Sequence, residues 1–458
     1  MKKQIHLNAF EMNCVGHISH GLWTHPENNR HRYTDLTYWT ELAQLLEYGK
    51  FDAIFLADVV GVYDVYKGGP ETAIREAVQI PVNDPLLLVP AMALVTRHLA
   101  FAVTVSATYE HPWGHARRMS TLDHLTNGRV AWNVVTSYLP SAARNYGLDR
   151  MIRHDERYEI ADEFMEVSYK LWEGSWDDDA VVRDVDRRVY TEPSRVHEIN
   201  HAGQYFTVPG PHLSEPSPQR TPVIYQAGTS TRGRQFAARH AEAIFLNAPS
   251  IEVMREHIQD IRRQAEGFGR NPDHVKMLTG LNVVVGRTRE EAQEKAEEYR
   301  RHWSREGVLT HYAGSSGFDL STYDPDEYLE YRDTDHQRTA AARYTTGGPK
   351  RTVREVIEAM GKLDRGYYFA VGTPEEIGDK IEHWVEATGL DGFNVGQFVS
   401  PGSFRDFVEL VVPELQRRGL YRTEYEGTTF RERLLGPGQS RLPASHPGAR
   451  FRRAPAAV

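Results

Sequence analysis

The stretch that decides the fold is residues 128–158, GRVAWNVVTSYLPSAARNYGLDRMIRHDERY. Residues 130–136 are mostly β-branched or aromatic, and such a run is typical of a strand that is buried on both faces. Asn133 interrupts the run, and a buried amide that finds no hydrogen-bond partner costs about 1–3 kcal/mol. The segment therefore predicts a buried parallel strand that carries one polar side chain inside the protein.

Polar residues gather where this strand ends. Ser137 and Tyr138 follow it directly, and Tyr158 lies in the helix expected from about residue 155. In α/β folds, ligands bind at the carboxyl ends of parallel strands. We therefore expect Asn133, Ser137, Tyr138 and Tyr158 to face a ligand.

The composition excludes several classes of protein. The 458 residues include 54 Lys and Arg against 63 Asp and Glu, a net charge of −9 with the two signs interspersed, which argues against a nucleic-acid surface. Cys14 is the single cysteine, so no intrachain disulfide or cysteine-based metal cluster is possible, and the 21 histidines show no metal-ligand spacing. The sequence shows neither a signal peptide nor a membrane span, and we expect a cytoplasmic protein.

Strand-like and helix-like segments alternate along the chain. The strand-like segments are residues 5–10, 51–58, 99–107, 130–136, 221–228, 242–248, 276–286 and 392–399. Eight such strands separated by helices predict an α/β fold, a (β/α)8 TIM barrel. Strict GxGxxG and GxxxxGK[ST] motifs are absent, which removes the main support for the Rossmann and P-loop folds.

The rest of the chain is assigned to insertions and a tail. We expect one barrel domain over residues 1–435, with insertions at about 59–83, 174–220 and 305–372. All three are expected on the carboxyl-terminal face, the catalytic face of such barrels, where they would form a lid. The Pro-, Gly- and Arg-rich tail 436–458 is expected to be a surface arm.

A small-residue turn follows the fifth strand. Residues 226–234, QAGTSTRGR, place Ser230 and Thr231 at a helix start, where free backbone N–H groups and hydroxyls suit a phosphate monoester. Arg232 and Arg234 would add positive charge. The alternative is an ordinary capped turn, which is common, but the turn's place on a later strand of a barrel favours phosphate.

Two other sites have competing interpretations. Asp58 closes the second strand, where it would bind the polar edge of a heterocycle or act as a base, or else cap a helix or form a structural ion pair. Cys14 and His17 follow the first strand; an activated nucleophile pair is one interpretation, but a lone buried cysteine is usually a small hydrophobic residue. Cys14 and His17 are therefore expected to line a pocket.

Several long motifs together resemble one family. WNVVTS, ARNYG, HDERYEIADEF, QAGTSTRGRQFA and GFNVGQFVSPGSFRDFVELVVPEL are similar to the bacterial-luciferase-like flavin monooxygenases, over residues 4–433. Within that family the chain resembles the branch of nitrilotriacetate, dibenzothiophene-sulfone and long-chain alkane monooxygenases. The N-terminal motifs IHLNAFEMNCVGHISHGLW, FLADVVGVYDVY and EAVQIPVNDPL are most similar to the alkane enzymes.

The resemblance implies a fold, a cofactor and a reaction. It implies a TIM barrel, a homodimer, and FMNH2 supplied by a separate NAD(P)H-dependent flavin reductase. O2 would add to flavin C4a to give a hydroperoxide, which inserts one oxygen atom into a hydrophobic substrate while the other leaves as water. The favoured reaction is terminal hydroxylation of a long-chain alkane to a primary alcohol.

The resemblance also assigns residues. It places the flavin contacts at Asp58, Ser137, Tyr138, Tyr158, Ala227, Gly228, Thr229 and Ser230. It places the reaction pocket at Cys14, His17, Tyr63, Gln79, Asn133, Tyr138 and His311, of which Tyr63, Gln79 and His311 carry no signal of their own in the sequence.

One position departs from the alkane enzymes. They have a histidine after WNVVTS, and this chain has Tyr138, a neutral hydrogen-bond donor where histidine would titrate near pH 7. The alternative substrates are an aromatic sulfone and an aminopolycarboxylate. Two further alternatives are a deazaflavin-dependent reductase and a flavin-binding barrel without turnover.

Overall fold

The protein contains a closed barrel of eight parallel strands. In the computed structural model, which describes residues 3–346, 349–363 and 368–453, each strand is hydrogen-bonded to two neighbours in the order β1, β2, β3, β4, β9, β10, β11, β13 and back to β1. The barrel strands are β1 (His6–Met12), β2 (Ala53–Ala57), β3 (Ala100–Ser106), β4 (Val130–Val135), β9 (Val223–Gln226), β10 (Ala243–Leu246), β11 (Lys276–Val285) and β13 (Gly392–Gly396). The predicted TIM barrel is confirmed, with all eight strands where they were expected.

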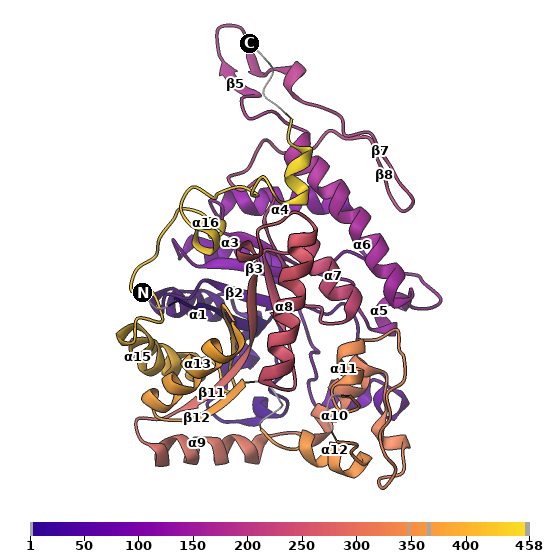
Figure 1. Ribbon diagram of the computed structural model, residues 1–458, viewed down its shortest axis with the longest axis vertical. Helices are drawn as coiled ribbons and strands as arrows, with labels where there is room; N and C mark the ends of the chain where they lie inside the picture. Colours follow the sequence, from indigo (N-terminus) through magenta and orange to yellow (C-terminus); the bar gives the residue numbers. More distant parts are fainter. Residues whose placement is uncertain (1–2, 347–348, 364–367, 454–458) are drawn as a thin grey trace.

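Helices surround the barrel (Figure 1). Those that follow barrel strands or lie against them are α1 (Leu36–Tyr48), α3 (Val89–Leu94), α4 (Pro112–Leu125), α6 (His154–Tyr169), α7 (Thr231–His240), α8 (Ile251–Gly267), α13 (Pro374–Thr388), α14 (Gly402–Asp406) and α15 (Val412–Arg417). The shorter α2 (Glu71–Arg75) and α5 (Pro140–Asn145) lie in the connections after β2 and β4. Within the described part of the chain, no helix is both long enough and apolar enough to cross a bilayer.

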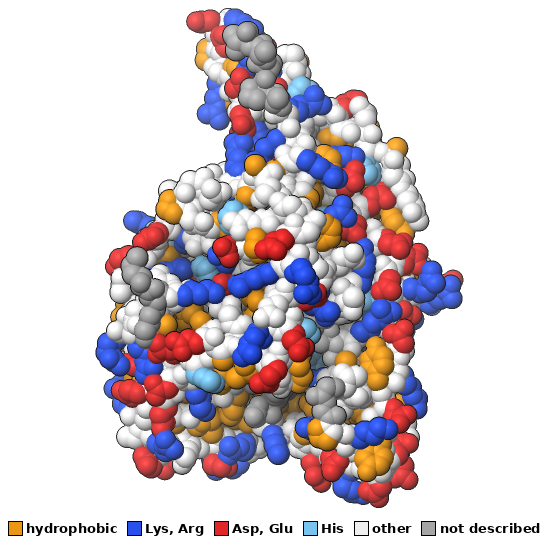
Figure 2. Space-filling model, viewed as in Figure 1, with side chains coloured by type: hydrophobic (Ala, Val, Ile, Leu, Met, Phe, Trp, Pro, Cys, Tyr) orange, Lys and Arg blue, Asp and Glu red, His pale blue; other side chains and the backbone are white. Residues whose placement is uncertain are grey.

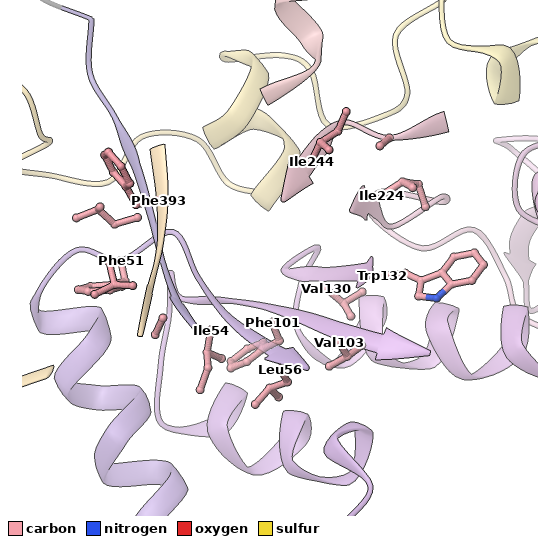
Figure 3. Close-up of a cluster of buried hydrophobic side chains, with 14 of the residues drawn as sticks. Phe51, Ile54, Leu56, Phe101, Val103, Val130, Trp132, Ile224, Ile244 and Phe393 are labelled. Carbon is pink, nitrogen blue, oxygen red and sulfur yellow. The ribbon is translucent and has the colours of Figure 1, made fainter. Parts of the chain in front are cut away.

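Two apolar layers follow from the alternation of side chains along the strands. The outer layer lies between strands and helices and includes Ile54, Phe101, Val130 and Trp132 (Figure 3). The inner layer fills the barrel; Phe10, Phe55 and Phe245 meet there edge to face, with ring centroids 5.0–6.1 Å apart. The strands are therefore buried on both faces, which is why their sequences read as nearly continuous apolar runs.

The amino-terminal end of the barrel is closed by a short helix near the end of the chain. Helix α16 (Phe430–Leu435) inserts Phe430, which stacks on Tyr225 inside the barrel with the ring planes 9° apart. Next to it, Arg431 forms a fully buried ion pair with Glu242 at 2.6 Å. Because this end is closed, the open end of the barrel is the carboxyl-terminal one.

The described residues of the insertion expected at 305–372 form three α-helices and a strand. It contains α10 (Arg305–Ser316), α11 (Arg338–Ala342), α12 (Val353–Met360) and β12 (Tyr368–Gly372), which pairs with the end of β11. The preceding α9 (Arg289–His302) lies with this group at one end of the molecule (Figure 1). The helix that returns the chain to β13 is α13, so the excursion starts directly after β11. Part of the expected insertion, 347–348 and 364–367, lies outside the described residues.

The position of the second insertion corrects the prediction. Residues 174–220 follow the end of α6 rather than the end of β4, and they lead into the start of β9. Gln219 in this segment donates to the carbonyl of Val130, the first residue of β4, at 2.9 Å. A barrel helix runs antiparallel to its strand, so this insertion lies at the amino-terminal end, away from the catalytic face. Its hairpin, β5 (Val181–Asp184) and β6 (Val189–Thr191), projects at the end of the molecule opposite α9–α12 (Figure 1).

The tail lies against the same amino-terminal end over its described part, residues 436–453. His446 is buried and its Nε2 lies 2.9 Å from the carbonyl oxygen of His240. Arg452 forms an ion pair with buried Glu173 at 2.6 Å. This part of the tail is therefore anchored to the barrel, and the remaining residues of the expected arm, 454–458, lie outside the described residues.

Candidate active site

A cavity of about 1100 Å³ opens at the carboxyl ends of β2, β4, β9 and β10. Residues of the third insertion, between 331 and 362, form its outer wall. All eight residues assigned to the flavin by resemblance line it: Asp58, Ser137, Tyr138, Tyr158, Ala227, Gly228, Thr229 and Ser230. The structure thus brings together in one cavity residues that lie up to 172 positions apart in the chain.

One end of the cavity is the turn between β9 and α7. Ser230 caps α7, and its Oγ accepts from the backbone N–H of Gly233 at 3.1 Å, so the first N–H groups of the helix face the cavity end. Gly228 lies beneath the Tyr158 hydroxyl: a Cβ at this position would come within 2.3 Å of Gln226 Nε2 and 2.7 Å of that hydroxyl. The turn is therefore a close-fitting backbone cradle, in which a Cβ at residue 228 would displace the side chains of Gln226 and Tyr158.

The two arginines expected to add charge there have carboxylate partners. Arg232 pairs with Asp162, and Arg234 pairs with Asp260 at 2.9 Å. Arg234 also donates to the carbonyl of Thr229 at 2.6 Å, which holds the turn in place. Their positive charge is thus largely compensated, which leaves the backbone N–H groups as the main donors that the turn could offer to an anion.

Asp58 stands on the opposite wall, at the end of β2. Burial, reinforced by the negative charge of Asp84, raises the pKa of the Asp58 carboxyl from 3.8 to about 7. No ion pair involves Asp58 among the described residues, so the structural-pair interpretation loses its support. A carboxyl group that titrates near neutrality inside a cavity suits contact with a ligand's polar edge.

The chain turns sharply after β4 to bring the next two residues to the cavity. Ser137 has φ of 56°, a left-handed conformation that is uncommon outside glycine, and its Oγ donates to Ser106 Oγ at 2.8 Å. Asn133, inside the barrel, donates to Thr104 Oγ1 at 2.9 Å, while its Oδ1 is buried with no hydrogen-bond partner among the described residues. The predicted buried amide is therefore only half satisfied by the protein.

Three hydroxyl and amide groups form a chain behind the cavity wall. The Tyr63 hydroxyl donates to Gln79 Oε1 at 2.7 Å and lies 2.5 Å from the Tyr138 hydroxyl. Burial, then the neighbouring Tyr138, raises the pKa of Tyr63 well above 10, so Tyr63 keeps its single proton. Because that proton goes to Gln79, the Tyr63 oxygen accepts from Tyr138, and the Tyr138 proton points away from the cavity.

The other reaction-pocket residues lie close by but not on the cavity surface. His311 meets the Tyr63 ring edge to face at 5.0 Å between centroids, and His17 meets Phe10 in the same way at 4.6 Å. Cys14 is buried, and burial raises the pKa of its thiol to about 12. A neutral thiol is not an activated nucleophile, which agrees with the small-hydrophobic interpretation.

The residues that the third insertion contributes to the cavity carry no signal of their own in the sequence. Thr339 Oγ1 lies 2.8 Å from Thr229 Oγ1, directly beside the cradle. Buried Arg157 donates to the carbonyl of Asp335 at 2.7 Å, and the backbone N–H of His154 donates to the Asp335 carboxylate at 2.9 Å. The insertion is therefore fastened to the start of α6 and to the turn after β9. Among the described residues, no group of His, Cys, Asp and Glu is arranged to hold a metal ion.

Comparisons with known proteins agree with this geometry. The luciferase-like monooxygenase family model matches residues 17–392. A long-chain alkane monooxygenase of Geobacillus thermodenitrificans is 61% identical over 99% of both chains, and a crystal structure of long-chain alkane monooxygenase superposes with a TM-score of 0.93, covering 99% of this chain and 100% of the other. Dimethyl-sulfide monooxygenase of Hyphomicrobium sulfonivorans is 51% identical over 99% of this chain and 94% of its own.

Another related crystal structure contains a flavin. The crystal structure of riboflavin lyase with modified FMN and riboflavin is 38% identical, with a TM-score of 0.92 over 99% of this chain and 100% of the other. The family match spans far more than half of the chain, and the closely similar relatives extend over nearly all of it. The resemblance noted in the sequence is confirmed: the chain belongs to the luciferase-like monooxygenase family and is a flavin-dependent monooxygenase.

Proposed function

We propose that this enzyme uses FMNH2, supplied by a separate NAD(P)H-dependent flavin reductase, to hydroxylate a long-chain alkane at its terminal carbon. One oxygen atom of O2 enters the substrate as a primary alcohol, and the other leaves as water with the two hydrogens of FMNH2. The identity of 61% to a long-chain alkane monooxygenase along the entire chain supports this substrate class.

The observation that carries the proposal is the mixed lining of the cavity. It includes the backbone cradle of Gly228 and Ser230. It also includes Val59, Val60, Leu139 and Ala142, which belong to a separate apolar cluster shared with the first insertion. A phosphorylated cofactor needs the first kind of surface, and a hydrocarbon needs the second.

The residues present fit FMN. The cradle that a Cβ would fill, with the helix start above it, would hold the phosphate through backbone N–H groups, and Tyr158 would close it from the side. Asp58 and Ser137 would hold the polar edge of the ring system. When bound in its reduced form, FMN supplies the activation of O2; the protein's part is to orient both partners and to exclude water.

The third insertion and the apolar residues of the lining would keep water away from the reaction. Reduced flavin that has reacted with O2 loses its oxidising equivalents as hydrogen peroxide when water reaches it. The Thr339–Thr229 contact and the Asp335 contacts hold the third insertion beside the cradle, and Leu139 and Ala142 give the lining apolar surface that would limit the access of water. Tyr138, whose proton is held by Tyr63, would offer an oxygen lone pair rather than a proton.

An aminopolycarboxylate is the charged alternative substrate. Three arginines of the lining are engaged, since Arg157 donates to carbonyls, Arg234 pairs with Asp260, and Arg338 pairs with Asp155. Arg343, Arg351 and Lys362 also line the cavity, so the preference for an alkane rests on the 61% identity to the alkane enzyme rather than on the cavity's charge.

Dimethyl sulfide is the second candidate, because a relative that acts on it is 51% identical. A sulfide of that size would fill little of a cavity of about 1100 Å³, so we rank it below an alkane.

The test is product analysis with labelled oxygen. The purified chain is combined with FMN, NADH, a generic flavin reductase and 18O2, and offered in parallel an alkane of about 16 carbons, dimethyl sulfide, dibenzothiophene sulfone and nitrilotriacetate. We expect 18O in a primary alcohol from the alkane alone. Labelled product from another substrate and none from the alkane would reassign the substrate, and peroxide without any labelled product would refute monooxygenation of this panel.

We further propose that the enzyme is a homodimer in solution, as the family resemblance implies. Light scattering should give twice the chain mass of 52.3 kDa. A mass near 52 kDa at micromolar concentration would contradict this assembly.

A further inference from the structure

We propose that His20 is a positioning residue that fixes the tautomer of His311. The inference rests on the proposed function and on the family resemblance, which places His311 in the reaction pocket. Neither the sequence motifs nor the family resemblance singled out His20, and it does not line the cavity.

The two imidazoles form a direct pair. His20 Nε2 lies 3.1 Å from His311 Nδ1, and the ring planes are inclined at 67° with centroids 5.0 Å apart. The His20 side chain belongs to a residue with no exposed surface, whereas His311 is partly exposed. The inner ring is therefore shielded from water, and it contacts the outer one through a nitrogen–nitrogen hydrogen bond.

The position of His20 is fixed by the helix that carries His311. Ser304, the N-cap of α10, donates its backbone N–H to the carbonyl of His20 at 3.0 Å. Gly307, one turn before His311 on the same helix, lies so close that a Cβ there would come within 2.9 Å of His20 Cβ. The loop after β1 and the start of α10 are thus held together around the pair.

The chemistry of such a pair couples the two tautomers. A single proton occupies the hydrogen bond between two neutral imidazoles, so if His20 donates from Nε2, His311 carries its own proton on Nε2; if His311 donates from Nδ1, its Nε2 is an acceptor. Without a partner at Nδ1, both tautomers of His311 become accessible. The tautomer of His20 therefore sets whether the far edge of His311 donates or accepts.

The His311 ring adjoins the polar chain that reaches the cavity. His311 contacts the Tyr63 ring, and the Tyr63 hydroxyl contacts Tyr138 on the cavity wall. A defined tautomer gives these neighbours a fixed pattern of donors and acceptors. A mixture would leave a fraction of the enzyme with the wrong pattern, which lowers kcat without removing substrate contacts.

The test compares three variants in the full-length protein. His20→Gln keeps an amide near the position of Nε2, His20→Leu removes the hydrogen bond, and His25→Gln is the control. His25 is also a buried histidine, but it contacts His302 and Tyr299 rather than His311. The first readout is the pair of 15N imidazole shifts of His311 in the flavin-free protein, assigned by their loss in His311→Leu.

We expect one tautomer in wild type, His20→Gln and His25→Gln, and averaged shifts in His20→Leu. With the substrate found above, kcat should fall at least tenfold in His20→Leu at nearly unchanged KM and recover to within about threefold in His20→Gln. Unchanged His311 shifts in His20→Leu would overturn the inference. So would equal loss of kcat in the Gln and Leu variants. If wild type shows no turnover while the shifts behave as expected, the proposed function fails and the tautomer assignment stands.

Discussion

The Asp58→Asn substitution should stabilise the enzyme, increasingly so as the pH rises. The folded protein raises the pKa of this carboxyl from 3.8 to about 7, mainly by burial and secondly through Asp84. Between these two values the unfolded chain has released its proton and the folded chain still holds it. Stability therefore falls as the pH rises from about 4 to 7, and the cost remains at higher pH.

The magnitude follows from the size of the shift. One pKa unit corresponds to about 1.4 kcal/mol, so Asp58 costs about 1.5 kcal/mol at pH 5 and about 4 kcal/mol at pH 8. Unfolding entropy of about 2.1 cal/mol/K per residue over 458 residues makes 1 kcal/mol equal to about 1 °C in Tm. Asparagine has no such cost, so the variant should melt about 1–2 °C above wild type at pH 5 and about 4 °C above it at pH 8.

The assay is thermal unfolding of the flavin-free protein at both pH values, with Asp84→Asn as the matched variant. Asp84 caps a short helical turn by accepting from Leu86 N, and asparagine is an equally good cap. Its removal takes away one cause of the raised pKa of Asp58, so this variant should gain less than Asp58→Asn at pH 8. A Tm difference for Asp58→Asn that is the same at pH 5 and pH 8 would refute the reasoning.

Three further predictions concern the cradle, the hydroxyl chain and the core. Gly228→Ala should weaken FMN binding at least tenfold in a fluorescence titration, because the new Cβ meets the surrounding side chains below 3 Å, whereas Gly114→Ala, in open space, should not. Tyr63→Phe removes the acceptor of the Tyr138 proton and should raise the peroxide released per NADH; unchanged coupling would contradict that role. Burial lowers the pKa of His115 to about 3, so below pH 6.5 the unfolded chain gains a proton at this residue and the folded chain does not. The substitution His115→Leu should therefore be more stabilising at pH 5 than at pH 8, by about 2 kcal/mol in the free energy of unfolding measured with denaturant.

The barrel was predictable because its signal is local and repeated. Each strand is buried on both faces, so each appears in the sequence as a short apolar run between turn residues, and strand β4 was expected within one residue of its bounds. The closure of the barrel's amino-terminal end by helix α16 was not predictable. Phe430 and Leu434 show helical spacing, but nothing in that spacing indicates that they fill a barrel formed by residues far earlier in the chain.

The side of the cavity where we propose that the cofactor binds has a partial signal in the sequence. The turn after β9 carries its own evidence in Gly228 and Ser230, and Asp58 ends a strand whose direction is known. Thr339 and Asp335 contact that site from more than 100 residues away, in a segment whose sequence shows no periodicity. Such contacts arise only when the insertion folds back onto the barrel. A single sequence does not show which distant residues will then lie close together.

The error over residues 174–220 shows which feature decides the face of an insertion. In a barrel unit the strand runs toward the catalytic face and the helix runs back, so the position depends on whether the insertion follows the strand or the helix. Residues 59–83 follow β2 directly and reach the site, whereas residues 174–220 follow α6 and cannot. By the same rule, described residues of the third insertion reach the site because the helix that returns to the barrel is α13, not α9. Within the described part of the chain, a lid for this cavity would therefore come from the first and third insertions, the two that supply Tyr63 and His311.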